Sequence, residues 1–183
     1  MILYLIRHGK TAANEAHLYC GSTDLPLSET GKEELRSLHY DIPGNTRFVT
    51  SGMKRTGQTL ELLFGTVPHT AQPDFREVDF GDFELHSYEQ LKEDPAYQNW
   101  ISGDNEQNLP PHGESGNQMK KRVLSALDRL LAENKDTVLI AHGGTIAILM
   151  AALFPRENRN RYQWQPKPGH GYRIEDGHYT ELP

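Results

Sequence analysis

Two short apolar stretches decide the fold: residues 2–6 (ILYLI), which precede an Arg-His-Gly triplet, and residues 137–141 (TVLIA), which precede His-Gly-Gly. Continuous apolar runs of this length are typical of strands that are buried on both faces of a parallel sheet. Residues 48–50 (FVT) are a third candidate strand. Each run leads into a glycine-containing turn and then a helical pattern, so the sequence predicts an α/β fold with a mostly parallel central sheet.

Local signals place the helices and the last strands. Capping-box spacing precedes apolar residues in three places: Thr30 with Glu33, Ser87 with Gln90, and Ser115 with Gln118. Met53, Leu60, Leu63 and Phe64 indicate a further helix. Asp176-Gly177 separates two short strand-like runs, which predicts a C-terminal β-hairpin. Residues 104–116 are rich in Asn, Pro and Gly and are expected to form a loop.

Length and charge limit the organisation and the partners. With 183 residues, of which 36% are hydrophobic, we expect one domain over residues 1–183. The net charge of −6 argues against nucleic acid as a partner, because its phosphates would be repelled. The single cysteine, Cys20, makes no internal disulfide, and no apolar run reaches the ~20 residues of a membrane span. The apolar start lacks the basic residues of a secretory signal, so we expect a cytoplasmic protein that does not bind membranes.

Several known catalytic motifs are absent from the sequence. Gln58 stands where a P-loop needs lysine, and residues 113–117 miss the last glycine of a nucleophile elbow. Cys20 has no arginine six positions later, as cysteine phosphatases require. The nine histidines show no metal-ligand spacing, so a metal site is not expected.

Side chains suited to phosphoryl transfer follow the predicted strands. Arg7 and His8 follow the first strand, His142 follows residues 137–141, and Arg55 follows the third strand and its turn. Ligands of open parallel sheets bind beyond the carboxyl ends of the strands, so we expect these side chains to share a pocket. A neutral imidazole can attack phosphorus, and guanidinium groups bind phosphate oxygens. A protonated carboxyl from residues 74–84 (DFREVDFGDFE) could supply the leaving group with a proton.

Each of these signals also has an ordinary structural explanation. An Arg-His-Gly triplet can be a surface feature, a glycine pair can be a tight turn, and an acidic stretch can be a solvated loop. The functional interpretation therefore rests on the joint pattern, in which every signal stands at the end of a strand.

A series of motifs runs in a fixed order through residues 1–150. They are LIRHGKT at 5–11 with Asn14, KR and QT within 54–59, Glu77 with FGDFE at 80–84, GES at 113–115 and LIAHGGT at 139–145. In these motifs the sequence resembles the histidine phosphatase superfamily, in its phosphoglycerate-mutase-like branch. The resemblance implies a three-layer α/β/α fold and catalysis without a metal or another cofactor.

The resemblance also implies roles for the matching residues. His8 would be the nucleophile that becomes phosphohistidine, and Glu77 would donate a proton to the leaving group, ahead of Asp79 or Asp82. The phosphoryl group would be bound by Arg7, Arg55 and His142. The remaining matches would contact phosphate or line the substrate pocket: Asn14, Thr11, Thr23 and the backbone of Gly143.

The length of the chain favours hydrolysis over isomerisation. Phosphoglycerate mutases of this family carry insertions and a C-terminal tail, for which 183 residues leave little room. Residues 80–100, the short loop at 110–115 and the final hairpin resemble the α-ribazole phosphatases of cobalamin synthesis. The expected substrate is therefore a small phosphate ester, with α-ribazole 5′-phosphate as the first candidate. Tyr88, Tyr97 and Trp100 are expected on a helix that covers the pocket, either to meet an aromatic base or as ordinary packing.

Other functions stay open at this point. They are a broader sugar-phosphate or nucleotide phosphatase, a phosphoglycerate mutase, and a phosphate-binding module without turnover. The intact set of histidines, arginines and Glu77 argues against the last of these. Nothing in the chain decides whether the protein forms a homodimer.

Overall fold

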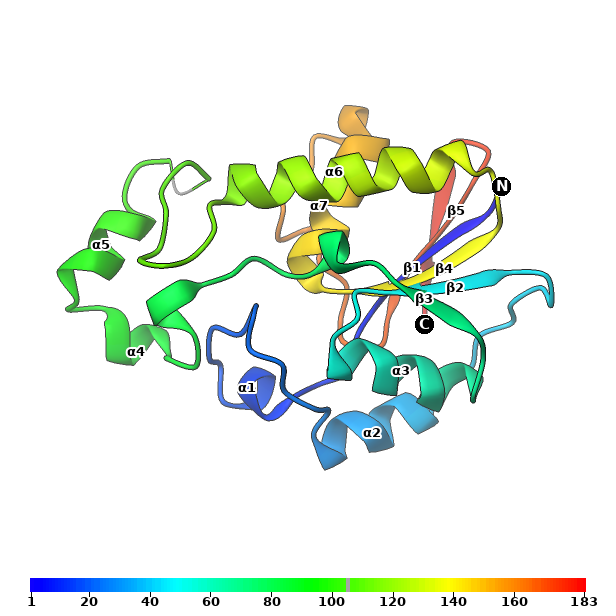
Figure 1. The fold of residues 1–183 in the computed structure, drawn as a ribbon, viewed down its shortest axis with the longest axis horizontal. Coiled ribbons are helices and arrows are strands. Elements are labelled where there is room, and N and C mark those ends of the chain that lie inside the picture. Colours follow the sequence, from blue (N-terminus) through cyan, green and yellow to red (C-terminus); the bar gives the residue numbers. More distant parts are fainter. Residues whose placement is uncertain (105) are drawn as a thin grey trace.

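The computed structural model describes residues 1–104 and 106–183, in which a six-stranded sheet lies between helices (Figure 1). The strands are β1 (Leu3–Arg7), β2 (Arg47–Thr50), β3 (His69–Ala71), β4 (Thr137–Ala141), β5 (Gly171–Glu175) and β6 (His178–Leu182). The α-helices are α1 (Ala12–Glu15), α2 (Glu29–Arg36), α3 (Lys54–Phe64), α4 (Tyr88–Leu91), α5 (Pro95–Ile101), α6 (Gly116–Ala132) and α7 (Gly143–Leu153). Short 3-10 turns cover Pro73–Phe75, Gly81–Phe83 and Pro155–Glu157. The α/β architecture predicted from the sequence is confirmed.

The sheet order places the two motif-bearing strands side by side. The order is β3-β2-β4-β1-β5-β6, and the pairings among β3, β2, β4 and β1 are parallel. In the register of β1 and β4, Arg7 lies opposite Ala141. The residues that follow these two strands therefore leave the sheet next to each other. The strand β5 pairs antiparallel with β1, and β6 pairs antiparallel with β5.

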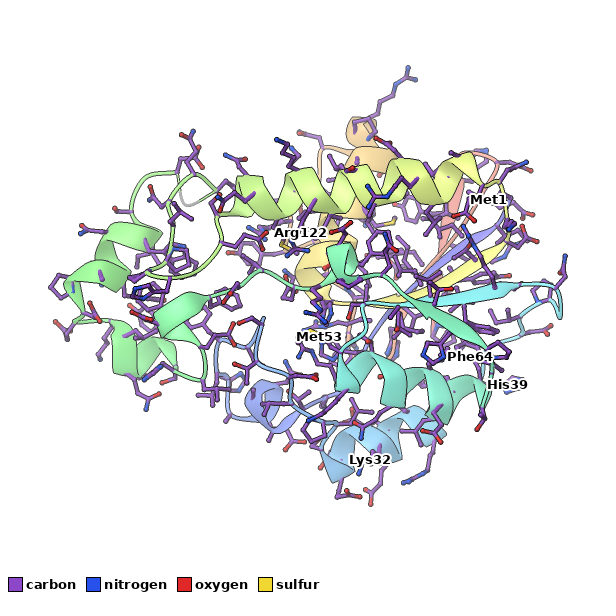
Figure 2. The ribbon with its side chains drawn as sticks, viewed as in Figure 1. Met1, Lys32, His39, Met53, Phe64 and Arg122 are labelled. Carbon is purple, nitrogen blue, oxygen red and sulfur yellow. The ribbon has the colours of Figure 1, made fainter. Side chains whose placement is uncertain are left out.

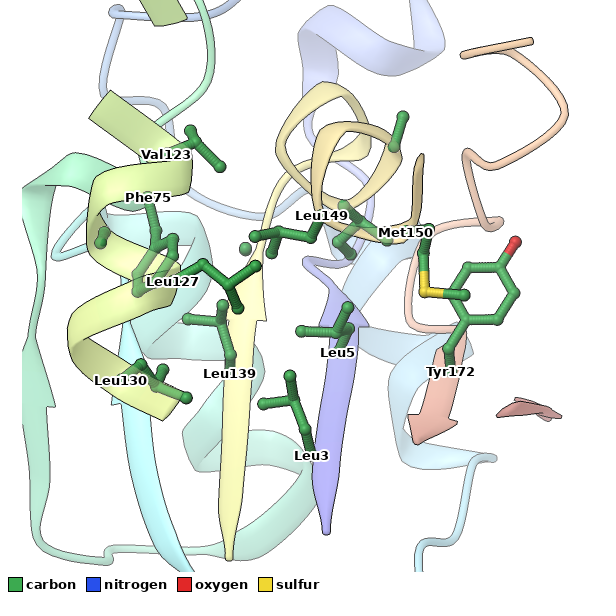
Figure 3. Packing of buried hydrophobic residues seen from close by; sticks show 14 of the residues in the cluster. Leu3, Leu5, Phe75, Val123, Leu127, Leu130, Leu139, Leu149, Met150 and Tyr172 are labelled. Carbon is green, nitrogen blue, oxygen red and sulfur yellow. The ribbon is translucent and has the colours of Figure 1, made fainter. Parts of the chain in front are cut away.

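The apolar runs are continuous because both faces of the sheet are covered. Leu3 and Leu5 of β1 pack with Leu139 in the core cluster beneath α6 and α7 (Figure 3). Alternate residues, Tyr4 and Ile6, pack on the opposite face in the cluster that includes Leu60 of α3 and residues near α2. A strand buried on both faces needs apolar residues at every position, which is why no alternating pattern is present in β1.

Two of the three predicted capping boxes are confirmed, and one is wrong. Ser87 caps α4 and Ser115 caps α6, each with the expected glutamine reaching back to the capping residue. The helix α2 instead begins after Ser28, whose hydroxyl accepts a hydrogen bond from Gly31 N at 3.1 Å. Thr30 is therefore a residue of the first helical turn. A serine two positions earlier competes for the same capping role, and serine is the stronger N-cap residue.

The C-terminal hairpin is confirmed, whereas β3 was not predicted. Asp176 and Gly177 have φ angles of 50° and 75°, which are the left-handed values of a type I′ turn. The strand β3 is only three residues long and fully exposed, so it carries no apolar signal. Within the described residues, no helix is long and apolar enough to span a membrane.

The helices α4 and α5 extend beyond the sheet on the side of α1 (Figure 1). They are held by an aromatic cluster in which the Tyr97 ring lies 5.4 Å from Phe83 and 5.7 Å from Trp100. The Tyr97 hydroxyl also shares a hydrogen bond of 2.5 Å with the Tyr19 hydroxyl. This cluster joins the extension to the loop that follows α1.

Candidate active site

The side chains of His8 and His142 meet directly beyond the ends of β1 and β4. The backbone N–H of His8 still donates to Ala141 O, at 3.0 Å, so the register of the sheet extends to the first histidine. The two imidazole rings lie edge to face with 5.0 Å between their centroids. Both histidines are buried, at 5% and 0% exposure. The strand register thus brings together two residues that are far apart in sequence.

The orientation of the His8 ring leaves one nitrogen free to react. Its Nδ1 lies 2.7 Å from Gly9 O, and because a carbonyl only accepts, Nδ1 carries the proton of the neutral ring. The lone pair of the neutral ring is therefore on Nε2. Burial lowers the pKa of His8 well below its usual value, and the positive charges of Arg55 and Arg7 lower it further. His8 is consequently a neutral imidazole near pH 7.

His142 is held at both of its ring nitrogens. Its Nδ1 accepts a hydrogen bond of 3.3 Å from Arg55 Nε, and its Nε2 donates to Ser51 Oγ at 2.8 Å. The Ser51 hydroxyl in turn donates to Thr56 Oγ1 at 3.2 Å, and the Thr56 hydroxyl donates to Met53 O at 2.7 Å. Burial lowers the pKa of His142 well below its usual value, with the charges on neighbouring groups adding to the effect. To bind a phosphoryl oxygen, His142 must replace its hydrogen bond with either Arg55 or Ser51 by one with that oxygen.

Arg7 contributes a buried donor without a partner. Its Nη1 donates to Pro166 O at 2.9 Å, but its buried Nε has no hydrogen-bond partner among the described residues. This N–H is therefore available as a donor to a bound group. Guanidinium donors fit anionic oxygens, so Arg7 is suited to bind an anion.

Arg55 comes from the first turn of α3 and is 1% exposed. Its Nη1 donates to Thr23 O at 2.8 Å and its Nη2 to Gly21 O at 2.7 Å. Together with the bond from Nε to His142, these contacts fix the plane of the guanidinium while further N–H donors remain. Burial lowers the pKa of Arg55, and the nearby acidic side chains oppose that shift. The site thus holds the buried Arg55, the partly buried Arg7 and two neutral histidines.

The carboxylate of Glu77 lies against the first turn of α7. Its Oε2 accepts a hydrogen bond of 2.8 Å from Gly144 N, and its Oε1 accepts one of 3.0 Å from Val78 N. The charge of Glu77 also acts on Arg7, whose pKa it raises against the larger effect of burial. Glu77 and Arg7 line the same cavity.

The other two candidate proton donors lie elsewhere. Asp79 accepts hydrogen bonds from Ser22 Oγ at 2.7 Å and from Gly81 N at 2.9 Å. Asp82 pairs with His112 at 3.0 Å on the surface. Neither carboxylate lines the cavity that contains Arg7 and Glu77. The geometry therefore favours Glu77 within the acidic stretch.

The remaining expected site residues divide into two groups. Gly143 is the first residue of α7 and lines the cavity next to Arg7. Asn14 borders a neighbouring hollow that also contains Arg7, and its Oδ1 accepts from the backbone N and the hydroxyl of Thr11. Thr11 caps α1 and does not line either hollow. Thr23 also lies outside the main cavity, and it contributes a carbonyl to Arg55 rather than its side chain.

The cavity at this site holds about 450 Å³. Arg7, Glu77 and the two glycines that begin α7 line it. Four aromatic residues also line it: Tyr19, Phe80, Trp100 and Tyr162. A ligand that combines an anionic group with a flat apolar group matches this lining.

The three aromatic residues expected to cover the pocket have different positions. Trp100 lines the cavity, Tyr97 is 1% exposed within the core of the extension, and Tyr88 is 52% exposed. They also lie on two short helices, α4 and α5, rather than one. Of the three, the structure therefore places Trp100 alone at the cavity.

Arg122 is an organising residue that the sequence did not reveal. It extends from α6 toward the segment that carries Glu77 (Figure 2) and donates to the carbonyls of Asp74, Arg76 and Glu77 at 2.8, 2.8 and 2.9 Å. Its guanidinium is oriented by a two-pronged ion pair with Glu114, with both distances 2.7 Å. Sequence reasoning missed both Arg122 and Ser51, because each forms hydrogen bonds with residues that are distant in sequence.

Known proteins are similar to this chain over nearly its whole length. The chain is 28% identical over 177 residues to an adenosylcobalamin/α-ribazole phosphatase of Salmonella typhimurium, covering 92% of this chain and 87% of that protein. A provisionally assigned α-ribazole-5′-P phosphatase structure from Escherichia coli superposes with a TM-score of 0.84 at 26% identity, over 99% of this chain and 94% of the other. A phosphoglycerate mutase structure from Thermus thermophilus gives a TM-score of 0.78 at 29% identity, over 100% and 99% of the two chains.

The family model of the histidine phosphatase superfamily (branch 1) matches residues 3–180, which include both histidines, both arginines and Glu77. The chain therefore belongs to the histidine phosphatase superfamily.

Proposed function

We propose that the protein is a metal-independent phosphomonoesterase in which His8 carries the phosphoryl group between substrate and water. The observation that carries this proposal is the state of His8: a buried neutral ring with its proton on Nδ1, between two arginines and against a second neutral histidine. A nucleophile at neutral pH needs this unprotonated nitrogen, and the transferring group needs the positive charges.

The first half of the reaction breaks the ester bond. His8 Nε2 attacks phosphorus, the N–P bond forms as the P–O bond breaks, and the leaving alkoxide takes a proton from the Glu77 carboxyl. Arg7 and Arg55 bind the phosphoryl oxygens, with the orphaned Arg7 Nε as one donor. This step uses Glu77 as the general acid.

The second half regenerates the histidine. The now ionised Glu77 accepts a proton from water while the water oxygen attacks phosphorus and the N–P bond breaks. Inorganic phosphate leaves, and Glu77 is again protonated for the next cycle. The same carboxyl thus serves first as general acid and then as general base.

For the substrate, we propose α-ribazole 5′-phosphate. The cavity is lined by Tyr19, Phe80, Trp100 and Tyr162, which can stack on a planar base, and by Arg7, which can bind the phosphate. The similarity to the α-ribazole phosphatases of Salmonella typhimurium and Escherichia coli supports the same choice.

A phosphoglycerate mutase is the second candidate, because the Thermus thermophilus structure of that name superposes over the full chain. The substrate of a mutase carries a carboxylate besides the phosphate, so the cavity would need a second, unpaired cation to bind that carboxylate. Of the described cavity residues, Arg161 is the cation away from Arg7, and it already pairs with Glu106. The charges of the cavity therefore favour an uncharged organic group, and hydrolysis over isomerisation.

The proposal is tested by phosphate release from p-nitrophenyl phosphate in excess EDTA, with wild type beside His8→Ala. We expect turnover in EDTA that the variant loses. Activity that requires added metal, or that survives the loss of His8, would overturn the mechanism. Isomerisation of phosphoglycerate at a rate above phosphate release would instead select the mutase.

A further inference from the structure

Glu84, in the acidic stretch that carries Glu77, does not line the cavity, and its carboxylate accepts hydrogen bonds from backbone N–H groups. Its Oε1 accepts hydrogen bonds from the N–H groups of Gly21 and Ser22, both at 2.9 Å, and from Phe80 N at 3.1 Å. Its Oε2 accepts from Gly21 N at 3.1 Å and Thr23 N at 3.2 Å. One carboxylate therefore receives the successive N–H groups of the whole turn 21–23. Such charge-assisted bonds are stronger and shorter than neutral ones.

The same turn holds Arg55 from its opposite side. The carbonyls of Gly21 and Thr23 are the two acceptors that fix the ends of the Arg55 guanidinium, at 2.7 and 2.8 Å. Three residues of backbone thus lie between a carboxylate and a guanidinium, with N–H groups toward the negative charge and carbonyls toward the positive charge. The negative charge of Glu84 and the positive charge of Arg55 therefore favour the same orientation of these peptide groups.

The turn packs closely against the segment that carries Glu84. A Cβ on Gly21 would lie 1.6 Å from Val78 O, so the turn is pressed against the segment that leads from Glu77 to Glu84. The backbone that follows Glu84 is also held, because Leu85 N donates to Tyr19 O at 2.7 Å and Tyr19 N donates to His86 O at 3.0 Å. These contacts hold Glu84 beside the turn, so that its carboxylate can orient the turn 21–23.

We propose that Glu84 is a positioning residue of the phosphoryl site, which acts through the turn 21–23 to orient the Arg55 guanidinium toward the phosphoryl oxygens. This proposal rests on the proposed phosphatase function, because it assumes that Arg55 binds the phosphoryl group. Glu84 itself touches neither substrate nor nucleophile. Without the Glu84 carboxylate the turn shifts. The Arg55 guanidinium then leaves the orientation in which its remaining N–H donors face the anion.

The test is a double-mutant cycle of inhibition by inorganic vanadate, which mimics the transferring phosphoryl group. The four proteins are wild type, Glu84→Gln, Arg55→Met and the double variant. Glu84→Gln keeps the shape of the side chain but removes its charge, and we expect it to weaken vanadate inhibition by about tenfold to a hundredfold, the loss typical of a misplaced catalytic group. In the Arg55→Met background the same change should weaken it by less than about twofold, because coupled residues are not additive.

A matched control and a second variant keep the outcome clear. Glu89→Gln removes a charge from the exposed pair with Lys92 on α4 and should leave vanadate inhibition unchanged. Glu84→Asp keeps the charge on a shorter arm, and it replaces Glu84→Gln in the cycle if the latter does not fold. It should show a smaller loss that likewise vanishes without Arg55.

Two results overturn the proposal. One is Glu84→Gln with the vanadate affinity of wild type, and the other is a loss that persists in full without Arg55, which would mean a general structural effect. If Arg55→Met binds vanadate as tightly as wild type, or if wild type does not bind it, the proposed function of the site fails as well. The two failures are therefore distinguishable.

Discussion

The substitution Gly144→Ala tests the proton donor while leaving the fold intact. Gly144 is the second residue of α7, where alanine is a favourable helical residue. A Cβ at this position would lie 2.4 Å from Glu77 Oε1. Ordinary contact begins at 3.4 Å, so the Glu77 carboxylate must move by about 1 Å. A misplacement of that size typically costs about a hundredfold in rate.

The predicted loss depends on the leaving group. The value of kcat/KM reports the steps through formation of phosphohistidine, in which Glu77 donates its proton to the departing alkoxide. An alkyl alkoxide needs that proton and p-nitrophenolate does not. We therefore expect Gly144→Ala to lower kcat/KM about a hundredfold with an alkyl phosphate and less than about threefold with p-nitrophenyl phosphate. The assay is initial-rate kinetics with both esters.

The chain offers a matched control for this change. A Cβ on Gly57, inside α3, would meet no atom within 4 Å beyond its chain neighbours and its own helix backbone, so Gly57→Ala causes no clash. It should stabilise the protein by up to about 1 kcal/mol through helix propensity and leave both rates unchanged. An equal loss with both esters in Gly144→Ala, or no loss at all, would refute the assignment of Glu77 as the proton donor.

The remaining predictions concern stability and substrate. In the unfolded chain, His8 and His142 are protonated below their ordinary pKa of about 6.5, whereas burial in the folded protein keeps both neutral. The free energy of unfolding therefore has its full value above that pH. Below it, this free energy falls by up to about 1.4 kcal/mol per pH unit for each histidine. Urea denaturation between about pH 6.5 and 5 measures this slope; His142→Gln should roughly halve it, and an unchanged slope would contradict it. Trp100→Ala should lower kcat/KM for α-ribazole 5′-phosphate about tenfold and leave glycerol phosphate nearly unaffected, and equal losses would argue against a base on that wall.

The sequence was sufficient to predict the frame of the fold and the strand ends at which the two histidines lie. The apolar strands β1 and β4 were evident because burial on both faces requires uninterrupted apolar residues. The pairing of their ends then follows from the rule for parallel sheets, and the structure places His8 and His142 with 5.0 Å between their ring centroids. The strand β3 had no such signal, because its three residues are exposed.

Contacts that depend on backbone atoms could not be predicted in this way. Glu84 was visible as one acid among several, but nothing in the sequence distinguishes a carboxylate that binds the turn 21–23 from one that lines the cavity. Ser51 and Arg122 act through hydrogen bonds to partners 91 and 45 residues away. Only the folded chain shows that Thr23 offers its carbonyl to Arg55 rather than its side chain to a substrate.

The most direct test of the central claim is to trap the covalent intermediate. Wild type and His8→Ala are mixed with α-ribazole 5′-phosphate in excess EDTA, quenched within milliseconds at alkaline pH, and digested for peptide mass spectrometry. We predict a phosphoryl group on Nε2 of His8 in wild type, lost on acid treatment, and no phosphorylated peptide in the variant. Phosphate release with no phosphohistidine at any quench time, or a phosphoryl group on another residue of an active enzyme, would contradict the mechanism proposed for this site.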